Sequence, residues 1–199
     1  MTRPVLVIFA KAPVIGGAKT RLARGIGKVS AWRLYRAMTA RLMRRLADRR
    51  WDTVLAVAPD AALKRCFPGV WPPGVKRRAQ GPGDLGARQA RVFSGRGPVC
   101  VIGSDAPDVT RADIASAFKA LKRHDAVTGP ALDGGYWLLA LNAPAPRGLF
   151  EGVRWSHAQT LSDLEARLAA HGLSVARLRA LADVDEAGDL RRQNRPASP

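Results

Sequence analysis

Cationic side chains and a hydroxyl group gather in one short segment near the start of the chain, residues 11–22. Cations and hydroxyls bind phosphate oxygens, and glycines allow a backbone to approach a bound group closely. The residues with these properties are Lys11, Gly16, Gly17, Lys19, Thr20 and Arg21. Their order and spacing differ from those of a Walker A loop. We predict that the segment binds phosphate groups; a basic surface loop is the alternative interpretation.

Two acidic residues, Asp105 and Asp108, follow the hydrophobic run of residues 98–103. Burial at the end of a strand would penalise an unpaired charge on Asp105. A hard divalent cation, Mg²⁺ or Mn²⁺, would remove that penalty, because such ions prefer oxygen ligands. Asp108 is equally well explained as part of the start of the next helix. The sequence therefore predicts a metal ligand at Asp105 and leaves the role of Asp108 open.

An Asp-Gly-Gly turn, residues 133–135, stands before the apolar run of residues 136–141. Such a turn is typical of a hairpin corner. It could equally present a carboxylate and an open stretch of backbone to a substrate. The candidate substrate-binding residues are Asp133, Gly134, Gly135 and Trp155.

Acidic residues also cluster near the end of this basic chain, at Asp183, Asp185, Glu186 and Asp189. The cluster indicates either a metal site or ion pairs. The start of a helix is a strong alternative, because acidic residues favour helix N-termini.

The elements that must position these residues are read from the hydrophobic pattern. Short apolar runs predict strands at residues 5–10, 53–58, 98–103, 126–128, 136–141 and 173–178. Apolar residues on one helical face predict a helix over residues 30–50 with Ser30 as its N-cap, and another over 84–93. Capping boxes predict two more helices, one from Thr110 with Asp113 and one from Ser156 with Gln159 that ends at Gly172.

This alternation of strands and helices favours a mostly parallel sheet covered by helices on both faces. Ligands bind such sheets at the carboxyl ends of the strands, so we expect the polar segments to form one site there. A chain of 199 residues is long enough for one domain with a substantial core. We expect this domain to span residues 1–193, with residues 194–199 as a loose tail.

The chain carries 33 Lys and Arg residues against 16 Asp and Glu, a net charge of +17. Such an excess can attract nucleic acid, acidic membranes or phosphate-bearing small molecules. The arginines of residues 33–45, however, lie opposite the apolar side of a predicted helix, as on a solvated face. No basic stripe interleaved with aromatic residues occurs. We expect non-specific attraction to polyanions and no specific nucleic-acid partner.

The two cysteines, Cys66 and Cys100, have no partners at metal-binding spacing, and Cys100 is expected to be a small buried hydrophobic residue. The apolar run of residues 5–10 is too short for a signal peptide or a membrane span. We therefore expect a cytoplasmic protein without a membrane span, and the oligomeric state stays open.

Five motifs, in order along nearly the whole chain, resemble the signature of a bacterial family of glycosyltransferase-A-like (GT-A-like) proteins. That signature runs AKAPxxGxxKTRL, GDLGxR, GSDxPD, GPxxDGGYxL and DVDxxxDL. It is matched here by residues 10–22, 83–88, 103–108, 129–138 and 183–190. The sequence departs from the usual pattern at residues 15–17 and 186–188. The family is similar to the nucleotide-diphospho-sugar transferase superfamily, which includes molybdenum-cofactor and phospholactate guanylyltransferases.

The resemblance implies a Rossmann-like, three-layer α/β sandwich of the GT-A type. It implies that Lys19 and Arg21 bind nucleotide phosphates and that Asp105 and Asp185 are ligands of Mg²⁺ or Mn²⁺. The candidate nucleotide- and phosphate-binding residues are then Lys11, Gly16, Gly17, Lys19, Thr20, Arg21, Asp84, Leu85 and Gly86.

Three functions remain open. The first, which we expect, is metal-dependent glycosyl transfer from a nucleotide-sugar to a small-molecule acceptor, with Asp133 and Lys19 as catalytic residues. The second is nucleotidyl transfer, in which a nucleoside triphosphate reacts with a phosphorylated small molecule and pyrophosphate leaves. The third is non-catalytic binding of nucleotide or nucleic acid.

Overall fold

The computed structural model describes residues 3–95, 97–142 and 144–182, and one mixed sheet forms its centre. The strands stand in the order β3-β2-β1-β4-β6-β5-β7. Their bounds are β1 Val5–Lys11, β2 Asp52–Ala58, β3 Lys76–Ala79, β4 Val99–Gly103, β5 Ala126–Pro130, β6 Tyr136–Leu141 and β7 Val175–Arg177. Only β6 runs antiparallel to its neighbours, β4 and β5, within this sheet of described strands. The predicted mostly parallel α/β architecture is confirmed.

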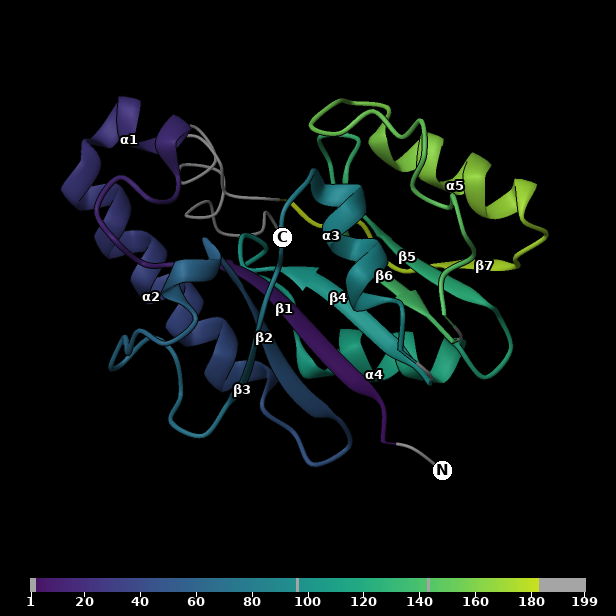
Figure 1. Cartoon of the computed structure of the whole chain (residues 1–199), viewed down its shortest axis with the longest axis horizontal. Helices are drawn as coiled ribbons and strands as arrows, with labels where there is room; N and C mark the ends of the chain where they lie inside the picture. The colour runs from purple at the N-terminus through teal and green to yellow at the C-terminus, as the bar shows by residue number, and fades with distance from the viewer. Residues whose placement is uncertain (1–2, 96, 143, 183–199) are drawn as a thin grey trace, which may run out of the picture.

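Helices cover both faces of the sheet, which gives three layers (Figure 1). The helices are α1 Thr20–Ile26, α2 Lys28–Leu46, the 3₁₀ turn η1 Asp60–Ala62, α3 Leu85–Val92, α4 Arg111–Ala120 and α5 Thr160–Ala170. α2 and α4 pack on one face, whereas α3 and α5 pack on the other. No helix among the described residues combines the length and the apolar character that a membrane crossing requires.

The central strand β1 explains why its sequence is an uninterrupted apolar run. Leu6 and Ile8 point to the α2/α4 face, and Val7 points to the α3/α5 face. All three side chains are buried, because a parallel sheet with helices on both faces leaves neither face to solvent.

Besides the 3₁₀ turn η1, two elements of the described chain escaped the sequence prediction. β3 reads Lys-Arg-Arg-Ala, so no apolar run marks it, and it is an edge strand that pairs with β2 among the described strands. α1 occupies residues that we expected to be loop, so Thr20 and Arg21 lie in its first turn. Phosphate-binding candidates are therefore held partly by a helix rather than by a loop alone.

The helix starts were predicted with mixed success. The capping box of Thr110 and Asp113 at the start of α4 is confirmed. By contrast, α2 begins at Lys28 after Gly27, not at a Ser30 cap, and α5 begins at Thr160 without the predicted Ser156–Gln159 box. Ser156 does not cap α5 and lies in the segment that precedes this helix. The predicted tail and the acidic cluster of residues 183–189 lie outside the described residues.

The sheet order brings the polar segments together. β1 lies between β2 and β4 and is parallel to both, so the carboxyl ends of these strands share one edge. β6 runs the other way, so its first residue, Tyr136, starts at that same edge. Segments that are far apart in the sequence are thus placed along a single edge of the sheet.

Candidate functional site

A lysine and an aspartate that the sequence singled out separately form an ion pair. Lys19 stands at the N-cap position of α1 with a left-handed backbone, φ 55°. Its Nζ lies 2.9 Å from Oδ1 of Asp105. The Lys19 side chain is only 3% exposed, whereas that of Asp105 is 46% exposed. The pair exists because β1 and β4 are neighbours, so the segments after them meet.

Tyr35 of α2 contacts the carboxyl ends of β1 and β4. Its hydroxyl accepts a hydrogen bond from the Lys11 amide and lies 2.9 Å from the Lys11 carbonyl, to which it can donate. It also lies 3.2 Å from Oγ of Ser104. Burial raises the pKa of Tyr35; the bond with Ser104 opposes this, and the nearby Asp105 charge adds to it. The tyrosine therefore remains a neutral hydroxyl that joins both strand ends to α2.

A polar cavity of about 470 Å³ opens at this edge. Its walls include the predicted phosphate-binding residues Lys11, Lys19, Thr20 and Arg21, together with Asp105. We refer to it as the first cavity. The structure thus brings together four of the six candidates from residues 11–22.

The two glycines of that segment do not line the first cavity among the described residues. Gly16 has a φ of 76°, which favours glycine at a turn. A Cβ on Gly17 would lie 2.6 Å from Cγ2 of Val14. Their glycine requirement therefore follows from the local turn, and their contact with phosphate stays a prediction.

Two polar residues that the sequence prediction missed also line the first cavity, Gln80 and Arg88. Gln80 follows β3, where it donates from Nε2 to the carbonyl of Ala56 at 2.9 Å. Arg88 of α3 donates from Nη1 to Oε1 of Gln80 at 3.3 Å. Gln80 was missed because β3 was missed. Arg88 is the last residue of the GDLGxR motif, which could have identified it.

The predicted nucleoside-binding residues 84–86 have three different positions. Asp84 caps α3, since its Oδ1 accepts from the amide of Ala87 at 2.8 Å. Leu85 is exposed and lines the first cavity. Gly86 is buried, and a Cβ there would lie 2.8 Å from Cζ2 of Trp155. Of the three, Leu85 is the one that faces the first cavity.

A second cavity of about 310 Å³ adjoins the first. Five residues line both, namely Phe9, Leu85, Gly103, Asp105 and Ser156. The second cavity also includes the predicted residues Asp133, Gly135 and Trp155. Asp105 therefore lies where the two cavities meet, with the candidate phosphate-binding residues on one side and the candidate substrate-binding residues on the other.

The turn of residues 131–135 combines both interpretations given to it. Oδ1 of Asp133 accepts from the amide of Gly135 at 2.8 Å, so Asp133 stabilises the turn and also lines the second cavity. Gly134 has a φ of 86°, and a Cβ there would lie 1.9 Å from the carbonyl oxygen of Ala158. Leu161 donates its amide to the Gly134 carbonyl at 3.0 Å. Gly134 thus packs against a neighbouring segment of the same chain, residues 154–160.

This segment, residues 154–160, forms one wall of the second cavity. Arg154 makes a two-bond ion pair with Asp163, at 2.8 and 2.7 Å. Ser156 has a left-handed backbone, φ 57°, which is uncommon outside glycine. His157 accepts from the amide of Gln159 through Nδ1, at 3.2 Å. Ser156 and His157 both line the second cavity, and the sequence prediction missed both as site residues.

A buried amide completes this wall. Gln89 of α3 donates from Nε2 to the hydroxyl of Tyr136 at 2.6 Å. Burial raises the pKa of Tyr136 well above its ordinary value, although the bond from Gln89 opposes this. Oε1 of Gln89 is buried and has no hydrogen-bond partner among the described residues. Both side chains line the second cavity.

The predicted metal site is represented here by Asp105 alone. The described residues contain no group of three or more His, Cys, Asp or Glu side chains placed to hold a metal ion. Asp185, the second predicted ligand, lies outside them. A divalent cation of this kind takes several oxygen ligands, and the described residues supply one carboxylate for it, Asp105, which also contacts Lys19.

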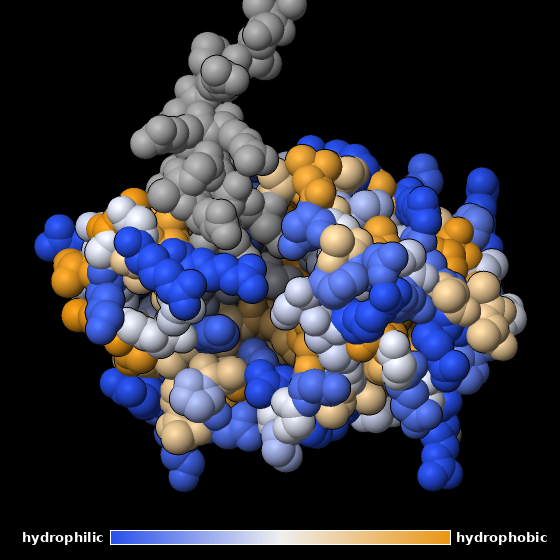
Figure 2. All heavy atoms as spheres, turned by 90° about the horizontal axis from the view of Figure 1, so that it is seen from above, coloured by the Kyte–Doolittle hydropathy of each residue, from blue (hydrophilic) through white to orange (hydrophobic). Residues whose placement is uncertain are grey.

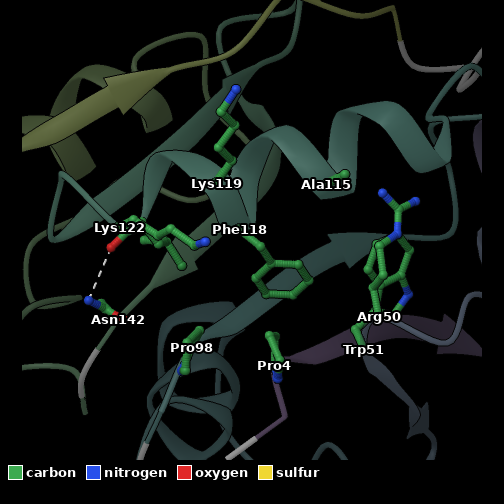
Figure 3. A pocket seen from close by; sticks show the side chains of 10 residues that line it. Pro4, Arg50, Trp51, Pro98, Ala115, Phe118, Lys119, Lys122 and Asn142 are labelled. Atoms are coloured by element: carbon green, nitrogen blue, oxygen red, sulfur yellow. Dashed lines mark hydrogen bonds between the residues drawn. The ribbon is translucent and has the colours of Figure 1, made fainter. Parts of the chain in front are cut away.

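A larger cavity, of about 690 Å³, lies at the opposite edge of the sheet (Figure 3). Pro4 and Pro98, which precede β1 and β4, line it with Trp51 and Phe118. Its described walls carry cations but no acid or histidine. Residues suited to acid–base or metal chemistry therefore lie at the other edge, although the cavity at this edge is the larger one.

Hydrophilic residues are interspersed with hydrophobic ones on the face shown in Figure 2.

Comparisons with known proteins agree with this fold. A bacterial family described as "Uncharacterized protein conserved in bacteria" (DUF2064) matches residues 41–157. None of the curated proteins is a significant match to the sequence. A crystal structure from Desulfovibrio desulfuricans G20, provisionally assigned as a nucleotide-diphospho-sugar transferase, is 30% identical with a TM-score of 0.89. The similarity covers 100% of this chain and 90% of that one.

Two more distant structures share the fold. CMP:2-keto-3-deoxy-manno-octonic acid synthetase, in complex with CTP, is 13% identical with a TM-score of 0.59. Rv0371C of Mycobacterium tuberculosis H37Rv, in complex with manganese, is 16% identical with a TM-score of 0.52. Each similarity covers 96% of this chain and 97% of the other.

Proposed function

We propose that this chain, which belongs to the bacterial family DUF2064, is a transferase. It would bind a nucleotide-sugar and transfer the glycosyl group to a small-molecule acceptor. The observation that carries this proposal is the Lys19–Asp105 pair, which stands at the junction of two adjoining cavities. A transferase needs two such compartments, one for the leaving nucleotide and one for the group that moves.

The first cavity suits the diphosphate. Lys11, Lys19, Arg21 and Arg88 line it, and charge-assisted hydrogen bonds from such groups are stronger than neutral ones. Lys19 is held in place by burial and by Asp105, so little freedom is lost when it meets a phosphate. Its role would be to stabilise the negative charge that grows on the nucleotide as the glycosyl bond breaks.

The second cavity suits the sugar and the acceptor. Asp133 can accept a hydrogen bond or a proton from an acceptor hydroxyl. Trp155 offers an aromatic surface beside it, as small-molecule sites commonly do. Asp133 thus acts on the acceptor, whereas Lys19 acts on the leaving nucleotide.

Dependence on Mg²⁺ or Mn²⁺ remains part of the proposal. Asp105 would supply one ligand and Asp185 another, and the ion would neutralise charge on the diphosphate. A relative of the same fold has been obtained as a manganese complex.

Nucleotidyl transfer is the second candidate, and one observation favours it. Lys19, Thr20 and Arg21 converge on the first cavity, which suits the pyrophosphate of a nucleoside triphosphate. In that reaction pyrophosphate would leave, and the phosphate of a small molecule would attack the α-phosphorus.

One experiment separates these functions. The protein is first screened by thermal shift against nucleoside triphosphates and nucleoside diphosphate sugars, with and without Mn²⁺. It is then incubated with the stabilising compounds and candidate acceptors. Release of nucleoside diphosphate supports glycosyl transfer, and release of pyrophosphate supports the second candidate. Binding without either product would indicate the non-catalytic function, and no binding by any of them would refute the proposal.

A further inference from the structure

The two adjoining cavities differ in charge. Four cations, Lys11, Lys19, Arg21 and Arg88, line the first cavity together with Asp105, which the two cavities share. The charged residues that line the second are Asp105 and Asp133, and no lysine or arginine of the described chain is among its walls. In a protein with 33 Lys and Arg against 16 Asp and Glu, a compartment with only acidic charges runs against the overall composition.

Asp133 gives the second cavity its negative charge. Asp105 is paired with Lys19, which offsets its carboxylate. Asp133 contacts the amide of Gly135 and forms no ion pair with any described residue. The arginine of the adjacent wall, Arg154, is held by the two oxygens of Asp163. An anionic group in this cavity would therefore meet the carboxylate of Asp133 and no lysine or arginine of the described chain.

The uncharged polar groups of the second cavity offer both kinds of hydrogen bond. Oε1 of Gln89, whose residue is 3% exposed, is a buried acceptor without a partner among the described residues. The hydroxyl of Tyr136 already accepts from Gln89 and retains its own hydrogen to donate. Nδ1 of His157 is used as an acceptor by Gln159, so in the neutral ring the hydrogen is on Nε2. Hydroxyl groups, which both donate and accept, match such a set.

We infer that the second cavity selects an uncharged, hydroxyl-bearing group, such as a hexose ring, and rejects groups that carry a carboxylate or a phosphate. The inference rests on the proposed function and narrows it to neutral glycosyl groups. Specificity of this kind combines attraction by hydrogen bonds with repulsion of the wrong charge. It also disfavours the second candidate function, because a phosphorylated small molecule would have to enter beside Asp133.

The test compares ligands that differ in one charge. The nucleoside diphosphate with the preferred base is identified first by calorimetry with ADP, GDP, CDP, UDP and dTDP. The matching hexose and hexuronate derivatives are then titrated into the same protein. They differ only at the exocyclic carbon, which is a CH2OH group in the hexose and a carboxylate in the hexuronate. We expect the hexose derivative to bind at least tenfold more tightly than the hexuronate derivative.

Variants assign the effect to Asp133. Asp133→Asn keeps the oxygen that the Gly135 amide needs, and we expect it to reduce the preference to less than threefold. Asp133→Lys should reverse the preference. Asp52→Asn is the matched control, because it removes one carboxylate from an exposed ion pair with Arg3 at the other edge of the sheet. It should leave the tenfold preference intact.

The possible failures are distinct. If no nucleoside diphosphate binds, the proposed function itself is wrong. If a diphosphate binds but hexuronate equals or exceeds hexose, the proposed function stands and the inference is overturned. A preference for hexose that persists in Asp133→Asn and Asp133→Lys also overturns it, since the charge would then not be the cause.

Discussion

Nζ of Lys19 lies 2.9 Å from Oδ1 of Asp105, so a buried cation is held in place by a carboxylate that is itself half exposed. The ammonium group is set in a fixed position before any ligand arrives. A preorganised charge costs no rearrangement during a reaction, which is the property expected of a group that stabilises a leaving phosphate.

Lys19→Ala should weaken binding of nucleoside di- and triphosphates far more than binding of the nucleoside. A hydrogen bond that involves a charged group contributes about 1.5–3 kcal/mol, a loss of about tenfold to 150-fold in affinity. Calorimetry with both ligand types measures this. Arg24→Ala removes an exposed cation of the same helix that does not line the cavity, and it should leave both affinities within about twofold. Equal losses for nucleoside and triphosphate in Lys19→Ala would contradict a phosphate contact.

Asp105→Asn should abolish the part of nucleotide affinity that depends on Mn²⁺. The amide keeps an oxygen within reach of Lys19, so the fold should persist, whereas an amide is a weaker ligand than a carboxylate. Titrations with and without Mn²⁺ give the metal-dependent difference. A difference that survives in the folded variant would show that Asp105 is not a metal ligand.

Asp133→Asn should leave thermal stability nearly unchanged and reduce turnover at least tenfold, about 1.4 kcal/mol of barrier. Stability is kept because the Asn oxygen can still accept from the Gly135 amide. Turnover falls because the amide cannot take a proton from the acceptor hydroxyl. Unchanged turnover with the true substrate would restrict Asp133 to its role in the turn.

Gly134→Ala should lower the free energy of unfolding by at least about 2 kcal/mol, because a positive φ is costly for alanine and its Cβ would overlap the Ala158 carbonyl. Gly152→Ala is the matched control, since Gly152 has a φ of 76° but open space around it. The difference between the two variants in urea unfolding isolates the clash. Equal losses would mean that the contact with Ala158 contributes nothing.

The wall of the second cavity should respond to pH through Asp163. Hydrogen bonds from Arg154 lower the pKa of Asp163 from 3.8 to about 2. A lowered pKa stabilises the folded protein above the unfolded value, and this contribution is lost as the pH falls from about 4 to about 2. Unfolding free energies of the wild type and Asp163→Asn should therefore differ by a constant amount at neutral pH and converge near pH 2. A gap that stays constant down to pH 2 would exclude a contribution from this ion pair.

The sequence predicted best where hydrophobic burial decides the structure. The strand that contains Leu6 and Ile8 follows from an apolar run, and the helix capped by Thr110 follows from a capping box. β3 was not predictable in this way, because it is an edge strand of lysine and arginine without an apolar run, stabilised by pairing with β2 and by hydrogen bonds of its arginines. The start of α5 was misplaced because Ser156 and Gln159 have the spacing of a cap without its hydrogen bonds.

The candidate site was predictable residue by residue but not as a geometry. Lys19, Asp105 and Asp133 stand out by residue type and by position after strands. Their arrangement depends on the strand order, which no local pattern specifies. Gln89 and His157 were missed because each lies in an ordinary helix or turn pattern, and only the tertiary structure brings them to one cavity.

The contact of Gly134 with Ala158, together with the bond from the Leu161 amide to the Gly134 carbonyl, ties the turn of residues 131–135 to the segment of residues 154–160. Neither can change length or backbone course without disturbing the other. Related chains that transfer a different group should therefore differ in both stretches together. Residues 11–22 can stay the same when these two stretches change.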